Sequence, residues 1–258
     1  MPNVNRSYLP PEILDYIVDH LYDERETLKQ CCLVSKSWIP RTRKHLFADI
    51  KFSTDRDLEA WQKAFPDPSR SPAHYTHALT IDTLRAITAA DAEEGNWIRI
   101  LSRAVQLGLY GSHNKLDTSL APFHRFSSSL KSLRVVTFTI PQSHVFNLIR
   151  SLPLLENLTL IDHNPSIIGD DESDELPNII PPTSPPLTGT LELLLGGVET
   201  ITRRLLNLPS LHFRKLVFFW RHKEDTRWMD ELVMTCSSTL ECLDVKCRLL
   251  GPFISVVR

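Results

Sequence analysis

The amino-acid sequence predicts an α/β repeat fold, in which a helical N-terminal region precedes an irregular solenoid with a curved parallel sheet. Two observations predict the solenoid. Leucines that open short apolar runs recur about every 26 residues, and the segments between these runs carry apolar residues at helical spacing. A third observation predicts the helical region, because two apolar helical stripes precede the first of these leucines.

The first N-terminal helix is expected to begin at Leu9-Pro10-Pro11-Glu12, because proline has a helical φ and its missing N–H is no loss in a first turn. Its apolar stripe comprises Ile13, Leu14, Ile17, Val18 and Leu21. After a charged break, Thr27 is the expected N-cap of a second helix with a stripe over residues 28–38. Pro40 should end or bend that helix. Helices this short are marginal alone, so another surface must cover their stripes.

The order of residue types in this region is specific. It reads L-P-x-E-I-L, an apolar helix, a charged break and then L-x-x-C-x-x-V-S-x-x-W, and it resembles the F-box. We take residues 7–47 as this domain. The resemblance implies a docking surface for the Skp-type adaptor of an SCF (Skp–cullin–F-box) ubiquitin ligase and, through the adaptor, for cullin. The charged break is longer than in some members of the family, which leaves the angle between the two helices open.

The resemblance assigns adaptor contacts to ten residues: Leu9, Pro10, Ile13, Leu14, Ile17, Leu28, Cys31, Val34, Ser35 and Trp38. Some of these side chains are expected to pack inside the domain instead, and the sequence does not say which. The helices could also be a cap that closes a larger core. An exposed apolar stripe that includes Trp38 would favour docking, whereas full burial would favour the cap.

The remaining residues, 48–258, are expected to form a leucine-rich-repeat-like domain. The alternation in residues 47–52 predicts its first strand, which the F-box resemblance also implies, followed by a helix over 57–65 and a loop over 66–72. The basic cluster at 41–45 is interpreted as a solvated helix face, because no interleaved aromatic residues make it a nucleic-acid patch.

The strand leucines of the repeats are Leu79, Leu107, Leu133, Leu158, Leu191, Leu216 and Leu243. Their steps are 28, 26, 25, 33, 25 and 27 residues, in the range of leucine-rich repeats. The phrase Ser128-Ser129-Leu130 returns as Ser238-Thr239-Leu240. A doubly wound α/β domain is the alternative, since it has the same alternation of strand and helix, but the short period favours the solenoid.

Three inter-strand segments offer an apolar helical face: Trp97, Ile100, Leu101 and Ala104; Val145, Leu148, Ile149 and Leu152; and Met229, Leu232, Val233 and Cys236. The asparagine that usually ends each repeat is replaced at four positions: Phe138, His163, Arg221 and Arg248. The repeats therefore resemble the degenerate leucine-rich repeats common in F-box proteins.

The long step of 33 residues contains an acidic and proline-rich insertion, residues 165–187, which we expect to be exposed. Its carboxylates lack the spacing and glycine of a calcium loop. The acidic residues around Ser173 are the basis for the hypothesis that this serine is phosphorylated.

Composition excludes several classes of function. A formal net charge of −2 gives no electrostatic argument for binding nucleic acid or an anionic membrane. No apolar run approaches the roughly 18–20 residues of a membrane span, and no signal-peptide core is present, so we expect a cytoplasmic or nuclear protein. Five cysteines, an odd number, favour reduced thiols. No nucleophile-elbow, phosphate-loop or H-E-x-x-H motif occurs, and Cys236, Cys242 and Cys247 lack zinc-ligand spacing. We expect no catalytic residue, metal or cofactor.

We therefore interpret the protein as a substrate-recognition adaptor of an SCF-type ligase. One alternative is a repeat-type interaction scaffold outside any ligase, and another is an α/β enzyme, which would need clustered titratable groups in a pocket. Trp220, Arg221 and His222 are the candidate contacts for an unidentified target protein, because aromatic and cationic residues are common anchors. Trp220 could instead cover a neighbouring repeat. The apolar stretch 253–257, without a polar cap, predicts a truncated or shortened solenoid.

Overall fold

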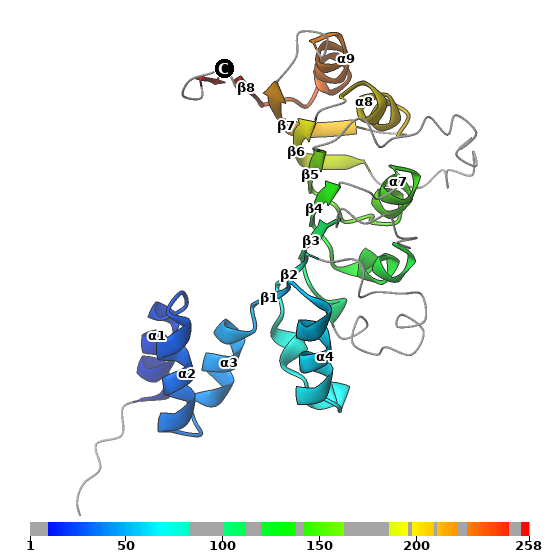
Figure 1. Cartoon of the computed structure of the whole chain (residues 1–258). Coiled ribbons are helices and arrows are strands. Elements are labelled where there is room, and N and C mark those ends of the chain that lie inside the picture. The colour runs from blue at the N-terminus through cyan, green and yellow to red at the C-terminus, as the bar shows by residue number, and fades with distance from the viewer. Residues whose placement is uncertain are drawn as a thin grey trace, which may run out of the picture.

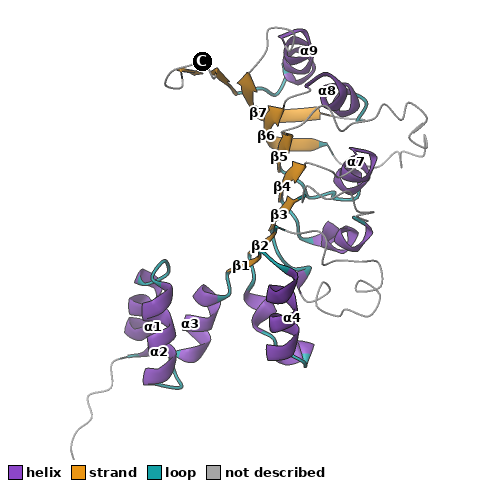
Figure 2. Cartoon of the chain, in the orientation of Figure 1, coloured by secondary structure: helices purple, strands orange, loops and turns teal. Residues whose placement is uncertain are grey.

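The computed structural model describes residues 10–82, 101–111, 120–137, 142–162, 186–195, 198–208, 211–220, 226–247 and 254–257, and the account below concerns these residues. They form one large sheet with helices packed along one of its faces, and a group of three helices beside its first strand (Figures 1 and 2). The predicted α/β architecture is present.

The three N-terminal helices are α1 (Pro11–His20), α2 (Arg25–Val34) and α3 (Ile39–Leu46). Two expectations about them are wrong. The second helix ends at Val34 instead of Trp38, because Ser35 has extended backbone, with φ −154° and ψ 145°. Pro40 lies in the first turn of α3, where a missing N–H costs nothing, so it starts a third helix instead of ending the second.

The N-cap of α2 also differs from the expectation. Glu24, not Thr27, occupies the N-cap position, and the Thr27 hydroxyl donates a hydrogen bond of 2.9 Å to Glu24 Oε2. Thr27 therefore lies in the first turn of α2, where its hydroxyl holds the side chain of the N-cap residue Glu24.

The sheet has its strands in sequence order. Its parallel strands are β1 (Asp49–Phe52), β2 (Ala78–Ile81), β3 (Gln106–Tyr110), β4 (Ser132–Thr137), β5 (Asn157–Asp162), β6 (Leu187–Leu195), β7 (Leu211–Trp220) and β8 (Cys242–Cys247). The last strand, β9 (Ile254–Val257), pairs with β8 in the antiparallel direction. A doubly wound sheet reverses its strand order at a switch point, and this order never reverses. The doubly wound alternative is therefore wrong.

All seven predicted strand leucines lie opposite one another in the parallel register, and Ile50 of β1 extends their row. Parallel strands in one sheet need long crossover connections, which here contain the helical elements. These are α4 (Asp55–Ala64), the 3-10 turns η1 (Pro68–Arg70) and η2 (Pro72–Tyr75), the 3-10 segment η4 (Ala121–Ser128), α7 (Gln142–Arg150), α8 (Val198–Leu206) and α9 (Thr226–Cys236). The expected helix after the first strand is α4, and the expected loop contains η1 and the start of η2.

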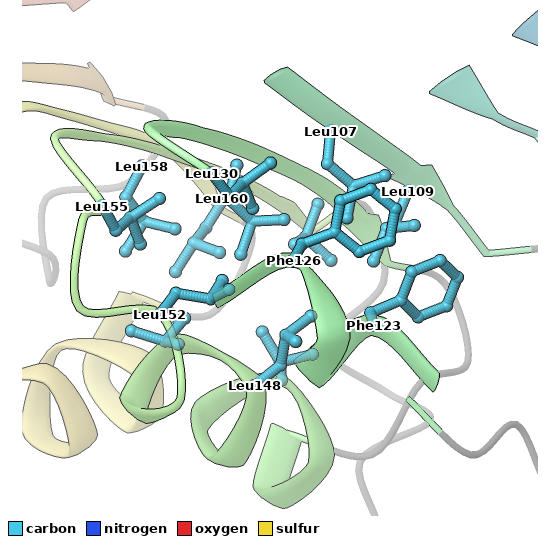
Figure 3. Packing of buried hydrophobic residues seen from close by; sticks show 14 of the residues in the cluster. Leu107, Leu109, Phe123, Phe126, Leu130, Leu148, Leu152, Leu155, Leu158 and Leu160 are labelled. Carbon is cyan, nitrogen blue, oxygen red and sulfur yellow. The ribbon is translucent and has the colours of Figure 1, made fainter. Parts of the chain in front are cut away.

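The main core lies between the strands and these helical elements (Figure 3). Alternate residues of the parallel strands face it, for example Leu107 and Leu109 of β3, which are 2% and 0% exposed. Phe123 and Phe126 of η4 are fully buried and stack with ring centroids 6.1 Å apart. The predicted apolar face of α7 is entirely buried, and so are Leu232 and Cys236 of α9.

The returning serine or threonine of the repeated phrase has a structural role. The Ser129 hydroxyl lies 2.5 Å from the Ser102 carbonyl oxygen and 3.0 Å from that of Ala104. The Thr239 hydroxyl lies 3.2 Å from the carbonyl oxygens of both Phe213 and Cys236. Ala104 and Phe213 occupy equivalent places, each three residues before the register-matched leucine of its repeat, Leu107 or Leu216. A hydroxyl at the equivalent position of two repeats, from Ser129 or Thr239, therefore binds the backbone of the repeat before it.

Several predicted features lie outside the described residues. These are most of the acidic and proline-rich insertion, the four positions that replace asparagine (Phe138, His163, Arg221 and Arg248), and two members of the first helical face, Trp97 and Ile100. The other two members of that face, Leu101 and Ala104, are fully buried.

Replacing Ser129 with alanine should lower the free energy of unfolding by about 1 kcal/mol, the usual net contribution of one hydrogen bond. Chemical denaturation would measure the change. The neighbouring Ser128 is exposed and makes no side-chain hydrogen bond in the described part of the chain, so Ser128→Ala is the matched control. Equal effects of the two substitutions on the free energy of unfolding would contradict a stabilising role of the Ser129 hydrogen bonds.

Replacing Gly189 with alanine should cost more than about 1 kcal/mol, because its φ is +88° and an added Cβ would lie 2.3 Å from the Glu156 carbonyl oxygen. Gly108→Ala is the control, since its Cβ would meet only side-chain atoms, the nearest being the Tyr110 ring at 3.3 Å and the Thr80 hydroxyl at 3.4 Å. A smaller loss of stability at Gly189 than at Gly108, again by chemical denaturation, would refute this account.

Candidate partner-binding surface

The N-terminal helices have a small core of their own. Val18 of α1, Leu28 and Cys31 of α2 and Thr42 of α3 are buried, with exposed fractions of 1%, 0%, 6% and 0%. The three apolar members of this set are absent from the main cluster between sheet and helices. The Thr42 hydroxyl donates to the Trp38 carbonyl oxygen at 2.7 Å, which satisfies the one buried polar group. Helices α1–α3 thus bury their own apolar residues without the sheet.

Polar contacts hold α3 against the other two helices. The Arg41 guanidinium binds both carboxylate oxygens of Asp19 on α1, with Nε 2.6 Å from Oδ1, and His45 Nε2 lies 2.7 Å from the same Oδ1. Arg25 of α2 donates to the Leu46 carbonyl oxygen at 3.2 Å. The Arg41 hydrogen bond holds the pKa of the Asp19 carboxyl well below its usual value, against the effect of burial, and His45 lowers it further.

An aromatic cluster joins these helices to the sheet. Phe47, at the C-cap of α3, lies 5.9 Å from Trp61 and 6.2 Å from Phe65, between ring centroids. Trp61 of α4 also contacts Phe52 of β1 at 5.9 Å. Edge-to-face contacts of this kind contribute about 0.5–1.5 kcal/mol each beyond their buried area. The three-helix group is therefore packed onto the first strand–helix unit through its last residue.

Helices α1 and α2 leave large apolar side chains in contact with water. Ile13 and Ile17 of α1 are 47% and 38% exposed, and Leu33 and Val34 of α2 are 85% and 68% exposed. Tyr16 and Tyr22 are also exposed. We call these six residues the α1–α2 apolar surface. Single exposed apolar residues are common, whereas these six fall within 22 consecutive residues, 13–34.

The ten residues predicted to contact an adaptor divide into four groups. Pro10, Ile13, Ile17 and Val34 are exposed, and Leu14, Ser35 and Trp38 are partly exposed. Leu28 and Cys31 are buried in the small core, so in this structure they hold the helices together and do not face a partner. Leu9 lies outside the described residues.

Sequence reasoning missed Tyr16, Tyr22 and Leu33 as members of the surface. Tyr16 lies three residues after Ile13, which is a helical spacing, and this signal was available. Leu33 and Tyr22 carried no such signal, because their exposure depends on where α3 packs.

Outside this surface, the features that bear on function are the predicted target contacts, groups of metal-ligating side chains and cysteine thiols. Arg221, His222 and the Trp220 side chain, the predicted target contacts, lie outside the described residues, although the Trp220 backbone ends β7. Among the described side chains there is no group of three or more His, Cys, Asp or Glu that could hold a metal ion. Cys236 is fully buried, and burial raises the pKa of its thiol. No described helix is long and apolar enough to cross a membrane.

Comparison with known proteins adds no relative: no protein-family model matches the chain, and no curated protein matches it.

Acid should weaken the contact between α1 and α3. The pKa of Asp19 is lower in the folded protein than its unfolded value of about 3.9, so the ion pair stabilises the fold above that pH and is lost as pH falls below it. Asp19→Asn should therefore reduce amide protection in α1 and α3 at neutral pH, by about 1 kcal/mol. The difference from the wild type should shrink below about pH 4.

Hydrogen exchange at neutral pH and at about pH 2, nearer the lowered folded pKa of Asp19, would measure this, because it reports on single helices. Asp23→Asn, at an exposed position in the turn after α1, is the control. A difference that persists unchanged in acid would refute the assignment to Asp19.

Proposed function

We propose that helices α1–α3 form an F-box and that the protein is a substrate-recognition adaptor of an SCF-type ubiquitin ligase. The observation that carries the proposal is the α1–α2 apolar surface, which remains exposed although the helices already have a buried core. Helices that merely capped the sheet would turn this surface toward it. The residue order that resembles the F-box supports the same reading.

The energetics are compatible with a stable complex. The α1–α2 apolar surface contains four aliphatic and two aromatic side chains, and burying a large apolar side chain contributes roughly 1.5–3 kcal/mol. Association costs on the order of 4–15 kcal/mol, so most of the six must be covered at once. Leu14 and Trp38, which are partly exposed, can add to the contact.

We also propose that the strand–helix units form a leucine-rich-repeat-like solenoid that holds the target protein. The matched register of the strand leucines and the sequential strand order support this part of the proposal. The adaptor would act by proximity: binding the target raises its effective concentration beside a charged ubiquitin-conjugating enzyme, and other subunits perform the chemistry. This role places the protein in the cytoplasm or nucleus.

A repeat-type interaction scaffold outside any ligase is the second candidate. The aromatic cluster around Phe47 favours this scaffold, because the cluster packs the helices onto the sheet. It does not explain why six large apolar side chains face water on the other two helices.

Co-purification with a Skp-type adaptor would test the proposal. The full chain should capture the adaptor, and Leu33→Asp or Ile17→Asp should weaken capture at least tenfold, because a charge would have to be buried in the interface. Met234→Asp is the matched control. Met234 is an exposed apolar residue on the helix side, 71% exposed against 85% for Leu33, and its substitution should leave capture unchanged.

Circular dichroism would establish that each variant is folded. Absence of capture by the folded wild type would reject the ligase role. Equal capture by all variants would reject the α1–α2 apolar surface as the docking site.

A further inference from the structure

The sheet carries a second set of buried apolar side chains on the face opposite the helices. Val136 of β4, Ile161 of β5 and Val217 of β7 are 6%, 6% and 5% exposed, yet none belongs to the main cluster. Helices α4, α7, α8 and α9 all lie on the other face (Figures 1 and 2). A sheet face open to water is usually polar, so this face departs from the ordinary pattern.

The register places the side chains of this face in rows across the strands. Tyr110, Val136, Ile161 and Leu194 are paired in succession from β3 to β6. Phe219 of β7 continues the row, because Leu193 pairs with Phe218. We call these five residues the open-face row. Tyr110, Leu194 and Phe219 are partly exposed, so a partner could cover them and the edges of the two buried residues between them.

Among the described residues, two cations on the open face form no ion pair, Arg134 of β4 and Lys215 of β7, and Arg134 lies on the same strand as a member of the open-face row. Lys51 Nζ lies 2.7 Å from Asp82 Oδ2, and Lys246 Nζ lies 3.8 Å from Asp244 Oδ2. Glu192 accepts a hydrogen bond of 3.2 Å from the Thr159 hydroxyl. Arg134, two residues before Val136 on the same strand, is exposed and forms no ion pair with any described residue. An arginine in this position favours a carboxylate on the partner.

The spacing of the row favours a helix over an extended chain. Strands are about 4.8 Å apart, so the row offers one side chain per 4.8 Å and spans roughly 19 Å from β3 to β7. A helix presents one side chain per turn on one face, every ~5.4 Å. An extended segment presents one on each face every ~6.6 Å, and it would need a free sheet edge for its backbone. The bend of the sheet toward this face, visible in Figure 1, suits a cylindrical partner.

We infer that the open-face row binds an amphipathic helix of the target protein, with the apolar side of the helix on the row and an acidic residue at its flank paired with Arg134. The inference rests on the proposed function in taking the partner to be the target that the ligase would recognise. The contact itself depends only on the sheet.

A displayed library of helical peptides of about 18 residues would test the inference. Each peptide would carry aliphatic or aromatic residues on one side and either acidic or basic residues at the flanks, and selection would use the full chain without adaptor. The enriched peptides should carry an acidic flank. Leu194→Asp and Arg134→Glu should each weaken their binding at least tenfold, and exchanging the acidic residue for lysine should restore binding to Arg134→Glu.

The controls are charge changes on the helix side of the molecule. Arg125→Glu, at an exposed position of η4, and Met234→Asp should leave peptide binding unchanged. Each open-face variant should still capture the Skp-type adaptor, which shows that it is folded. Failure of the library to yield a helical binder, enrichment of basic peptides, or binding that both open-face variants leave intact would overturn the inference. Peptide binding together with absent adaptor capture would reject only the ligase role.

Discussion

The structure depends on one row of branched apolar side chains that runs through every parallel strand at the same register. Ile50 opens this row and the seven strand leucines continue it, and all but Leu243 are buried against the helical side. Parallel strands cannot be joined by tight turns, so each needs a crossover. The described helical elements of these crossovers, such as η4 and α7, cover the row on one face of the sheet. The hydroxyls of Ser129 and Thr239 then bind backbone carbonyl oxygens of the preceding units.

The helices bury the apolar side chains on one face of the sheet, and the opposite face also carries apolar side chains. The α1–α2 apolar surface and the partly exposed members of the open-face row, Tyr110, Leu194 and Phe219, place apolar side chains outside the main core. Both lie beside polar contacts that are already satisfied, such as the Asp19–Arg41 pair and the Lys51–Asp82 pair. The side chains at both places are apolar, which is compatible with the proposed binding of other proteins.

The aromatic cluster of Phe47, Phe52, Trp61 and Phe65 connects these two surfaces. It packs the end of α3 against the first strand and the first helix behind the sheet. The three-helix group and the sheet therefore meet through rings with defined contacts. If the α1–α2 apolar surface and the sheet each bind a partner, as proposed, this aromatic packing fixes the distance between the two partners.

Much of the fold was determined by the sequence alone. The strand leucines, the apolar face of α7 and the strand before α4 all follow from periodicity, because a buried row in a repeated unit must recur in the sequence at a fixed spacing. The resemblance of the N-terminal residues to a docking domain is also a property of residue order. The tertiary structure decided the rest. Which of Leu28, Cys31, Ile17 and Leu33 faces water depends on where α3 packs, and α3 has in its first turn a proline, Pro40, that local rules predict to end a helix. The apolar row on the open face became visible only when register aligned residues from five strands, since single valines and isoleucines in a strand do not reveal which face they occupy or what lies beside them.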